Sequence, residues 1–183
     1  MTRREWLLAA GASVLTGAAT RAQHGGAPMH HPPQSAEELA GPADVTLRIG
    51  RLRHEIAPRR VVQTLAYNGQ VPGPLLRVSR GRALTVDVFS DTEVEDIVHW
   101  HGLHIRPAVD GVYEQGTPGV PPRGRRRYVF TPEPAGMRWY HSHNAAGRDL
   151  SRSTYTGQFG GMLVDDGRDP GAYDADVPLL LHE

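Results

Sequence analysis

The sequence predicts an all-β fold, an antiparallel β-sandwich, and three observations lead to this prediction. Nine short segments alternate apolar and polar residues, and turn-forming residues rich in Gly and Pro separate them. No stretch keeps a 3.6-residue apolar period over three helical turns. Alternation gives each strand one buried face and one exposed face, and many short strands with frequent turns are typical of two packed antiparallel sheets.

The strands are expected in this order along the chain: Val45 to Ile49, Val61 to Tyr67, Leu75 to Val78, Ala83 to Phe89, Ile97 to His104, Arg127 to Thr131, Gly136 to His141, Gly160 to Val164 and Val177 to Leu181. Turn signals separate them: Asn68-Gly69, Pro72-Gly73-Pro74, Arg80-Gly81, Asp110-Gly111 and Pro121-Pro122. Each signal ends a strand because Gly and Asn accept a positive φ and Pro presets φ for a turn.

Residues 1–22 are expected to form an export signal that is not part of the fold. A twin arginine at positions 3 and 4 precedes a run of apolar and small residues from Leu7 to Ala19, and small residues at Thr20 and Ala22 suit cleavage after Ala22. The run is shorter than the roughly 20 residues that a bilayer crossing needs, so no membrane span is expected. This pattern indicates export by the Tat pathway to the periplasm or the medium.

The rest of the chain has the length of a linker followed by one domain. Residues 23–43 are rich in Gly, Pro and His without an apolar period, which predicts a flexible linker, and residues 44–183 are expected to form the domain. The chain stops directly after the apolar run Val177 to Leu181, which suggests a domain cut from a larger protein. The roles of the linker His and Met residues stay open.

Composition excludes several classes of function. The 20 basic residues, all arginine, balance 20 acidic residues, so no nucleic-acid partner is expected. The basic run from Arg123 to Arg127 is interpreted as a solvated loop. The absence of cysteine excludes disulfides, and it also excludes a blue-copper site in this chain because that site needs a thiolate ligand.

Two His-x-His pairs carry the chemistry: His99 with His101, and His141 with His143. In a strand, residues i and i+2 point to the same face, so each pair presents two imidazoles on one side. Four imidazole nitrogens on one patch predict a metal cluster or a site shared with further protein. Imidazole suits copper, zinc, iron and nickel, and spacing alone leaves the choice open.

The motifs around these pairs resemble those of the multicopper oxidases, the family of laccases, bacterial copper-resistance oxidases and ferroxidases. HWHG, followed about 40 residues later by WYHSH, resembles the first copper-binding motifs of that family. The similarity extends through YNGQVPGP at residues 67–74, VDGV at 109–112 and GQFGGMLV at 157–164. It implies a cupredoxin-like, Greek-key sandwich, the N-terminal domain of an oxidase.

The resemblance implies copper as cofactor and a role for each histidine in a trinuclear cluster that reduces O2 to water. His99 would bind type 2 copper, His101 and His141 one type 3 copper, and His143 the other. Further cupredoxin domains, or another subunit, would supply the remaining ligands and the Cys-containing copper site. This chain alone should therefore be inactive, and the reducing substrate, whether a phenol, a cuprous or ferrous ion or another donor, stays open.

Asp110 has two interpretations. It occupies the position of an acidic residue that donates protons and orients groups near the cluster in bacterial members of the family, and it is also a suitable turn residue before Gly111. His104 and His182 are not assigned as ligands.

Other functions compete with the oxidase interpretation. The main alternative is a stand-alone exported copper-binding protein that buffers or transfers metal through the same four histidines. A zinc or iron hydrolase is disfavoured, because it usually needs a carboxylate base at the metal and a barrel larger than this chain. A copper nitrite reductase is also disfavoured, since that family has a Cys-containing copper site in its first domain. A His-Cys-His segment beyond Glu183 would favour the oxidase, and a stop codon there the buffering protein.

Overall fold

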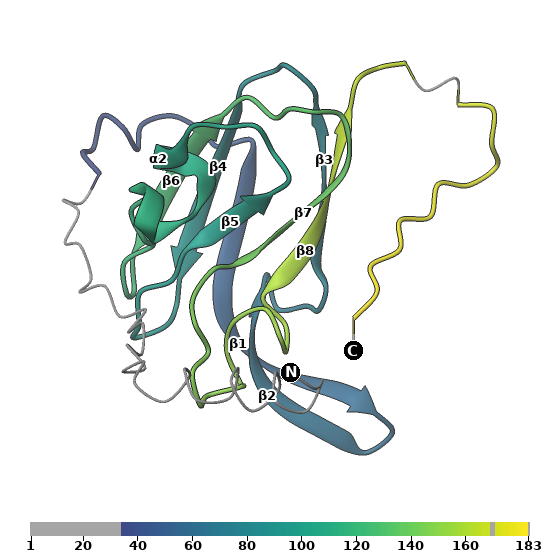
Figure 1. The fold of residues 1–183 in the computed structure, drawn as a ribbon. Coiled ribbons are helices and arrows are strands. Elements are labelled where there is room, and N and C mark those ends of the chain that lie inside the picture. Colours follow the sequence, from purple (N-terminus) through teal and green to yellow (C-terminus); the bar gives the residue numbers. More distant parts are fainter. Residues whose placement is uncertain (1–33, 169–170, 183) are drawn as a thin grey trace, which may run out of the picture.

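Two four-stranded sheets pack face to face in the structure, a computed structural model that describes residues 34–168 and 171–182 (Figure 1). The first sheet has the order β2-β1-β4-β6 and the second β3-β8-β7-β5. The strands are β1 (Val45–Ala57), β2 (Arg60–Tyr67), β3 (Gly73–Ser79), β4 (Leu84–Ser90), β5 (Val98–His101), β6 (Arg125–Phe130), β7 (Gly136–Ser142) and β8 (Phe159–Asp165). A short helix, α2 (Pro107–Asp110), and a 3-10 turn, η1 (Tyr113–Gln115), lie between β5 and β6.

The predicted β-sandwich is confirmed, and the first eight predicted segments form strands. The first strand is longer than expected. Its second half, residues 51–57, is largely polar and pairs with β2 in a hairpin that extends beyond the sandwich (Figure 1). Apolar alternation did not predict this half because its side chains have no core to enter.

The core lies between the two sheets, and alternation decides which side chains enter it. Leu47 and Val86 enter from the first sheet, and Trp100 and Tyr140 from the second; all four are fully buried. Since neighbours in a strand point to opposite faces, the residues on either side of Trp100 point to the outer face of the second sheet. That outer face carries the candidate site.

Both sheets are mixed, so the antiparallel pairing expected from the sequence holds for four of the six strand pairs. β1 pairs with β4 in parallel, and so does β3 with β8, whereas the other four strand pairs are antiparallel. From β2 to β7 the chain passes repeatedly from one sheet to the other, which separates β1 from β4, and β3 from β8, by long connections. Parallel pairing requires such connections, and short-range turn signals do not reveal it.

The last three arginines of the run from Arg123 to Arg127 lie in a strand, which corrects their interpretation as a solvated loop, whereas Arg123 is exposed in the turn before it. Arg125 begins β6, and the side chains of Arg126 and Arg127 are buried. Asp87 of β4 lies opposite Arg127 and accepts hydrogen bonds from its Nε at 2.7 Å and its Nη2 at 2.8 Å. A carboxylate that lies 40 positions earlier in the sequence therefore makes burial of the guanidinium possible.

The same arginine holds the part of the expected linker that the structure describes. The Gln34 side chain donates to the carbonyl oxygen of Arg127 and accepts from its N–H, at 2.9 and 2.6 Å. The Arg127 guanidinium also donates to the carbonyl oxygens of Ala40 and Gly41. Residues 34–41 are thus attached to β6, while the expected export signal and the first part of the linker lie outside the described residues.

The ninth predicted strand, Val177 to Leu181, is wrong. Residues 166–168 and 171–182 contain no strand, and the Val177, Leu179 and Leu181 side chains are largely exposed. An apolar segment becomes a strand only when another strand offers backbone partners, and none is placed beside this one among the residues described.

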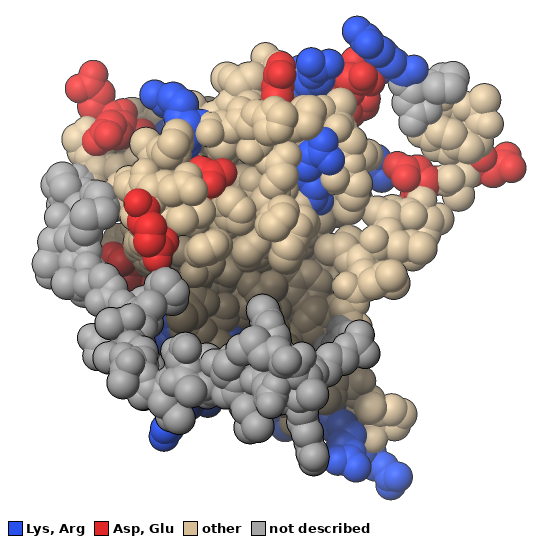
Figure 2. Space-filling model, in the orientation of Figure 1, with Lys and Arg blue, Asp and Glu red and all other residues tan. Residues whose placement is uncertain are grey.

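Within residues 34–168 and 171–182, no helix is long and apolar enough to cross a bilayer. On the face drawn in Figure 2, arginines and acidic residues are interspersed.

Candidate metal centre

Strands β5 and β7 bring the two His-x-His pairs together on the outer face of the second sheet. Their register places His99 opposite His141 and His101 opposite Trp139. Side chains directly opposite each other in an antiparallel pair lie on the same face and in contact distance. Pairing of these two strands therefore converts two sequence motifs about 40 residues apart into one cluster.

His143 joins the cluster from just beyond the end of β7. Its N–H donates to the carbonyl oxygen of Ile97 at 3.2 Å, so the backbone still follows the neighbouring strand at this point. The centroid of its ring lies 5.4 Å from that of His99 and 6.1 Å from that of His141. All four predicted residues are therefore on one surface, with His101 and His143 exposed.

Three of the imidazoles are close enough to share a metal site. The candidate ligand atoms of His99, His101 and His141 all lie within 4.8 Å of one another. Of these atoms, His101 Nδ1 and His141 Nε2 lie 3.4 Å apart. Two nitrogens that each lie about 2.0 Å from one metal ion at a tetrahedral angle are about 3.3 Å apart. The spacing of this pair therefore fits a single first-row metal ion.

Hydrogen bonds determine which nitrogen of two rings is free. His99 Nδ1 donates to the carbonyl oxygen of Asp110 at 2.7 Å, and His141 Nδ1 donates to that of Ser142 at 2.9 Å. Because a carbonyl oxygen only accepts, Nδ1 carries the proton in each ring and Nε2 keeps its lone pair. Such a bond at the far nitrogen fixes the tautomer and orientation of a metal-binding imidazole.

The surroundings also favour the neutral form of two of the rings, those of His101 and His141. Burial, with the neighbouring rings of His99, His101 and His143, lowers the pKa of His141 to about 4. Desolvation and the neighbouring rings of His99 and His143 lower the pKa of His101 as well, although Asp110 acts in the opposite direction. A metal ion binds the neutral form, so the lowered pKa values reduce the competition of protons with a metal ion for His101 and His141.

Asp110, at the end of α2, lies beside the cluster as well as in a turn. Its carbonyl oxygen accepts the His99 hydrogen bond, and its carboxylate Oδ2 is 3.5 Å from His99 Nδ1. Both side chains are mostly buried, with 15% exposed for His99 and 17% for Asp110. The geometry thus agrees with both interpretations of Asp110, because a turn residue here necessarily touches the site.

The close approach of α2 to β5 depends on Gly111. This residue has a φ of +91°, and a Cβ at its position would lie 1.9 Å from the carbonyl oxygen of Val98. The buried Thr117 hydroxyl accepts from the Gly111 N–H at 2.9 Å and donates to the carbonyl oxygen of Pro107 at 2.5 Å. These contacts hold the helix end against the strand that carries His99.

Trp139 is a residue of the site that sequence reasoning missed, since it is more typical of a sandwich core. Its ring stacks on His141 at a centroid distance of 4.1 Å and lies 4.8 Å from that of His101. The signal was its position two residues before His141, because i and i+2 share a face. It therefore packs against both His101 and His141.

His104 and His182, which were not predicted as ligands, lie apart from the cluster. His104 is exposed, and its N–H donates to the carbonyl oxygen of Glu133. The His182 ring stacks on Phe159, with centroids 4.7 Å apart. The His and Met residues of the expected linker lie outside the described residues.

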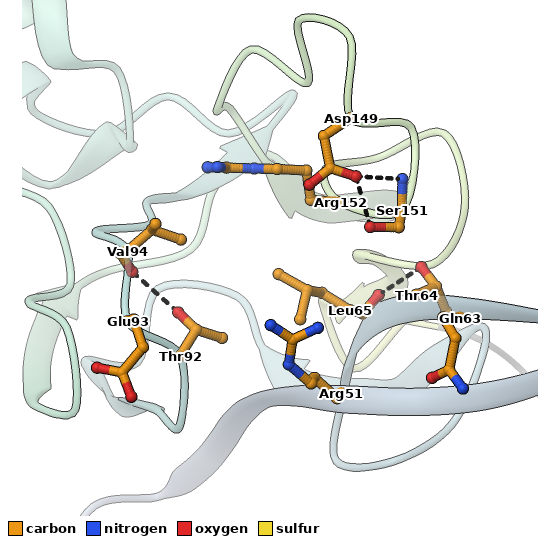
Figure 3. A pocket seen from close by; sticks show the side chains of 10 residues that line it. All are labelled: Arg51, Gln63, Thr64, Leu65, Thr92, Glu93, Val94, Asp149, Ser151 and Arg152. Carbon is orange, nitrogen blue, oxygen red and sulfur yellow. Dashed lines mark hydrogen bonds between the residues drawn. The ribbon is translucent and has the colours of Figure 1, made fainter.

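A polar pocket of 130 Å³ lies elsewhere, where β1 and β2 face the loops before β5 and β8 (Figure 3). None of the four histidines lines it, and its charged side chains are two basic and two acidic: Arg51, Arg152, Glu93 and Asp149. The Asp149 carboxylate accepts from the N–H and hydroxyl of Ser151. The formal charges that line the pocket therefore sum to zero.

The sequence profile of the multicopper oxidases matches residues 51–169. Copper resistance protein A of Pseudomonas syringae pv. tomato is 32% identical over 136 residues, which cover 74% of this chain and 21% of that protein. The multicopper oxidase MmcO of Mycobacterium tuberculosis is 33% identical over 123 residues, which cover 67% of this chain and 23% of that protein. The matched region thus spans about a fifth of the length of these curated relatives.

Solved structures agree with this similarity. Lac15 from a marine microbial metagenome superposes with a TM-score of 0.62 at 32% identity, over 70% of this chain and 33% of that one. The blue copper oxidase of Nitrosomonas europaea superposes with a TM-score of 0.61 at 33% identity, over 67% of this chain and 38% of that one. At identities of 32% and 33%, these likenesses support a shared family as well as a shared fold.

Proposed function

The chain belongs to the multicopper oxidase family, and from this we propose that it is the N-terminal cupredoxin-like domain of an oxygen-reducing enzyme, with four histidines that bind part of a trinuclear copper cluster. The observation that carries the proposal is the meeting of all four imidazoles on one surface, with nitrogens of two of them 3.4 Å apart. Imidazole nitrogen is a ligand that copper binds well.

The proposed ligand assignment is the one that the resemblance to the multicopper oxidases implies, and the positions of the rings are compatible with it. His101 Nδ1 and His141 Nε2 face each other and would share one type 3 copper. His143, whose ring is farther from His141, would bind the other type 3 copper, and His99 the type 2 copper. Further cupredoxin domains or another subunit would supply the remaining ligands, since the matched region is about a fifth of the length of the relatives.

In the proposed mechanism, copper held by these histidines would supply electron transfer from a reducing substrate to O2, which would be reduced to water. The residues of the protein would orient the imidazole rings and supply protons for O2 reduction. Asp110 holds the His99 ring through its carbonyl oxygen, and its carboxylate Oδ2, close to that ring, can hold a proton for delivery to the cluster. Trp139 restricts rotation of the His101 and His141 rings. Reduction of O2 consumes protons, so a titratable group here has a direct use.

Electron entry is proposed to occur outside this chain. A blue-copper centre needs a thiolate, and the sequence has no cysteine. The chain alone should therefore bind copper incompletely, show no intense blue colour and lack oxidase activity. The twin arginine at positions 3 and 4, which lies outside the described residues, supports export of the protein through the Tat pathway to the periplasm or medium.

The test of this function is O2 consumption by the full-length, copper-loaded protein supplied with an electron donor such as a phenol, a cuprous salt or a ferrous salt. We expect catalytic uptake of O2 with at least one donor, and none after removal of copper by a chelator. Tight copper binding without O2 uptake with any of the three donors would instead favour a protein that buffers copper.

Asp110→Asn tests the proton role. Asparagine keeps the shape of the side chain and the backbone carbonyl that holds His99, but it has no titratable proton. We expect O2 consumption to slow, with the larger loss toward higher pH, where water supplies fewer protons, while copper content stays near normal. The measurement is the steady-state rate against pH together with copper per protein.

The matched control is Glu114→Gln, which neutralises an exposed carboxylate four residues further along the chain. It should leave the pH profile unchanged. An Asp110→Asn enzyme with wild-type rates across the whole range would reduce Asp110 to a turn residue.

A further inference from the structure

Asp96 is a buried carboxylate just before β5 that the proposed mechanism does not use. Asp96 is 1% exposed, and among the described residues it forms no ion pair within 4.0 Å. Three donors reach it: the Ile97 N–H and the Ser142 hydroxyl bind Oδ1, both at 2.7 Å, and Gln158 Nε2 binds Oδ2 at 2.6 Å. Burying a charge without such partners is costly, so the three hydrogen bonds account for its presence.

The donors belong to the strands that carry the histidines. Ser142 is the middle residue of the second His-x-His pair, and its side chain points away from the imidazoles, into the sandwich. Gln158 is 0% exposed and directly precedes β8, whose Phe159 pairs with His141. The Ser142 N–H also donates to the carbonyl oxygen of Gln158 at 3.0 Å. One carboxylate thus joins the start of β5, the end of β7 and the start of β8, with β7 in the middle (Figure 1).

We infer that Asp96 is a positioning residue that sets the spacing of the two His-x-His pairs from behind. The hydrogen bond to Ser142 fixes the backbone between His141 and His143, and the adjacent Ile97 carbonyl receives the N–H of His143. Movement of Asp96 therefore shifts both histidines of the second pair relative to those of β5. This inference rests on the proposed copper function and adds a residue outside the ligand set.

The network tolerates only an acceptor at position 96. The Ser142 oxygen also accepts from the Asn144 N–H at 3.2 Å, and Gln158 Oε1 accepts from the Ser153 N–H at 2.6 Å. The Gln158 side-chain amide therefore cannot flip, because its NH2 group would then face the Ser153 N–H. Burial raises the pKa of Asp96, and the hydrogen bonds from Gln158, Ser142 and the Ile97 amide act in the opposite direction. In Asp96→Asn, the new amide NH2 would face the Gln158 NH2.

This polarity allows a test by exchange. Asp96→Asn places two donors face to face, and Gln158→Glu places two carboxylates face to face. The double variant Asp96→Asn with Gln158→Glu restores one donor and one acceptor at the same distance, and the carboxylate introduced at position 158 can still accept from Ser153. We expect each single variant of the full-length protein to bind copper at the cluster roughly 10- to 100-fold more weakly, as changes in residues that orient metal ligands do. The double variant should recover most of this loss.

The readouts are copper affinity by competition with a chelator, copper per protein and the electron paramagnetic resonance spectrum of the Cu(II) protein. Ser142→Ala provides a milder variant if the single exchanges do not fold, and should broaden or shift that spectrum. Its matched control is Ser90→Ala, which removes a hydroxyl that is equally buried at the end of β4, hydrogen-bonded to Thr92 in the other half of the sandwich. The control should keep the wild-type spectrum and affinity.

The proposal is overturned if the single exchanges and Ser142→Ala lower the melting temperature but keep wild-type copper affinity and spectrum, or if the double variant recovers nothing while folded. Failure of the copper function itself has a different signature. In that case His101→Ala also leaves the copper affinity of the protein unchanged.

Discussion

His101→Ala or His143→Ala in the full-length protein is expected to abolish O2 reduction while the distant electron-entry copper stays loaded and reducible by substrate. Each of these histidines is proposed to bind a different type 3 copper. Removing either would leave one type 3 copper without one of its ligands, and it would not alter the thiolate site that is proposed to lie outside this chain. The measurements are O2 consumption, copper per protein and bleaching of the blue absorption on addition of substrate under anaerobic conditions.

His104→Ala is the matched control for this experiment. His104 lies three residues from His101 in the sequence but is exposed and outside the cluster. Its replacement should leave both copper content and O2 consumption at the wild-type level. Normal turnover by His101→Ala and His143→Ala would contradict the proposed ligand set.

Gly111→Ala should have the second large effect, on folding as well as on the site. The new Cβ would lie 1.9 Å from the Val98 carbonyl oxygen and 2.4 Å from His99 Cα. Both are backbone atoms, so a change of side-chain rotamer cannot relieve the clash. We expect a loss of roughly 2 to 6 kcal/mol in the free energy of unfolding, from a strained backbone together with overpacking. We also expect α2 to move away from β5, so that Asp110 no longer holds the His99 ring.

Gly116→Ala separates the two causes of this loss. Gly116 has nearly the same φ, +92°, and also follows a short helical turn, but nothing lies within 4 Å of its Cβ position. The free energy of unfolding of Gly116→Ala should fall only by the cost of the positive φ, roughly 1 to 2 kcal/mol. The variant should keep normal copper content. Denaturant unfolding of the copper-free protein and copper per protein measure the difference. Equal losses in the two variants would show that close packing at Gly111 is unimportant.

Sequence patterns were sufficient for properties that depend on residues close together in the chain. Alternation predicted eight strands, and i, i+2 spacing predicted that each histidine pair shares a face. Motifs such as HWHG and WYHSH were specific enough to indicate the family, which the match over residues 51–169 confirms. Whether the four histidines bind copper as assigned stays a prediction, since their geometry agrees with it but does not test it.

Other properties depend on which distant segments meet. Arg127 is buried because Asp87 lies opposite it in β4, and Val177 to Leu181 is not a strand because no neighbour among the described residues pairs with it. Asp96 was not predicted as a site residue, although it joins both histidine strands, because its partners Ser142 and Gln158 lie 46 and 62 positions away.

The sequence by itself therefore determined where eight strands form, which histidines pair on one face and which family the chain belongs to. Only the tertiary structure decided the parallel pairings, the burial of Arg126 and Arg127, the contact of Asp110 with His99 and the stacking of Trp139 on His141. The physical reason is that side-chain direction along a strand repeats every two residues and is encoded locally, whereas the partner of a strand is selected by the packing of the whole core.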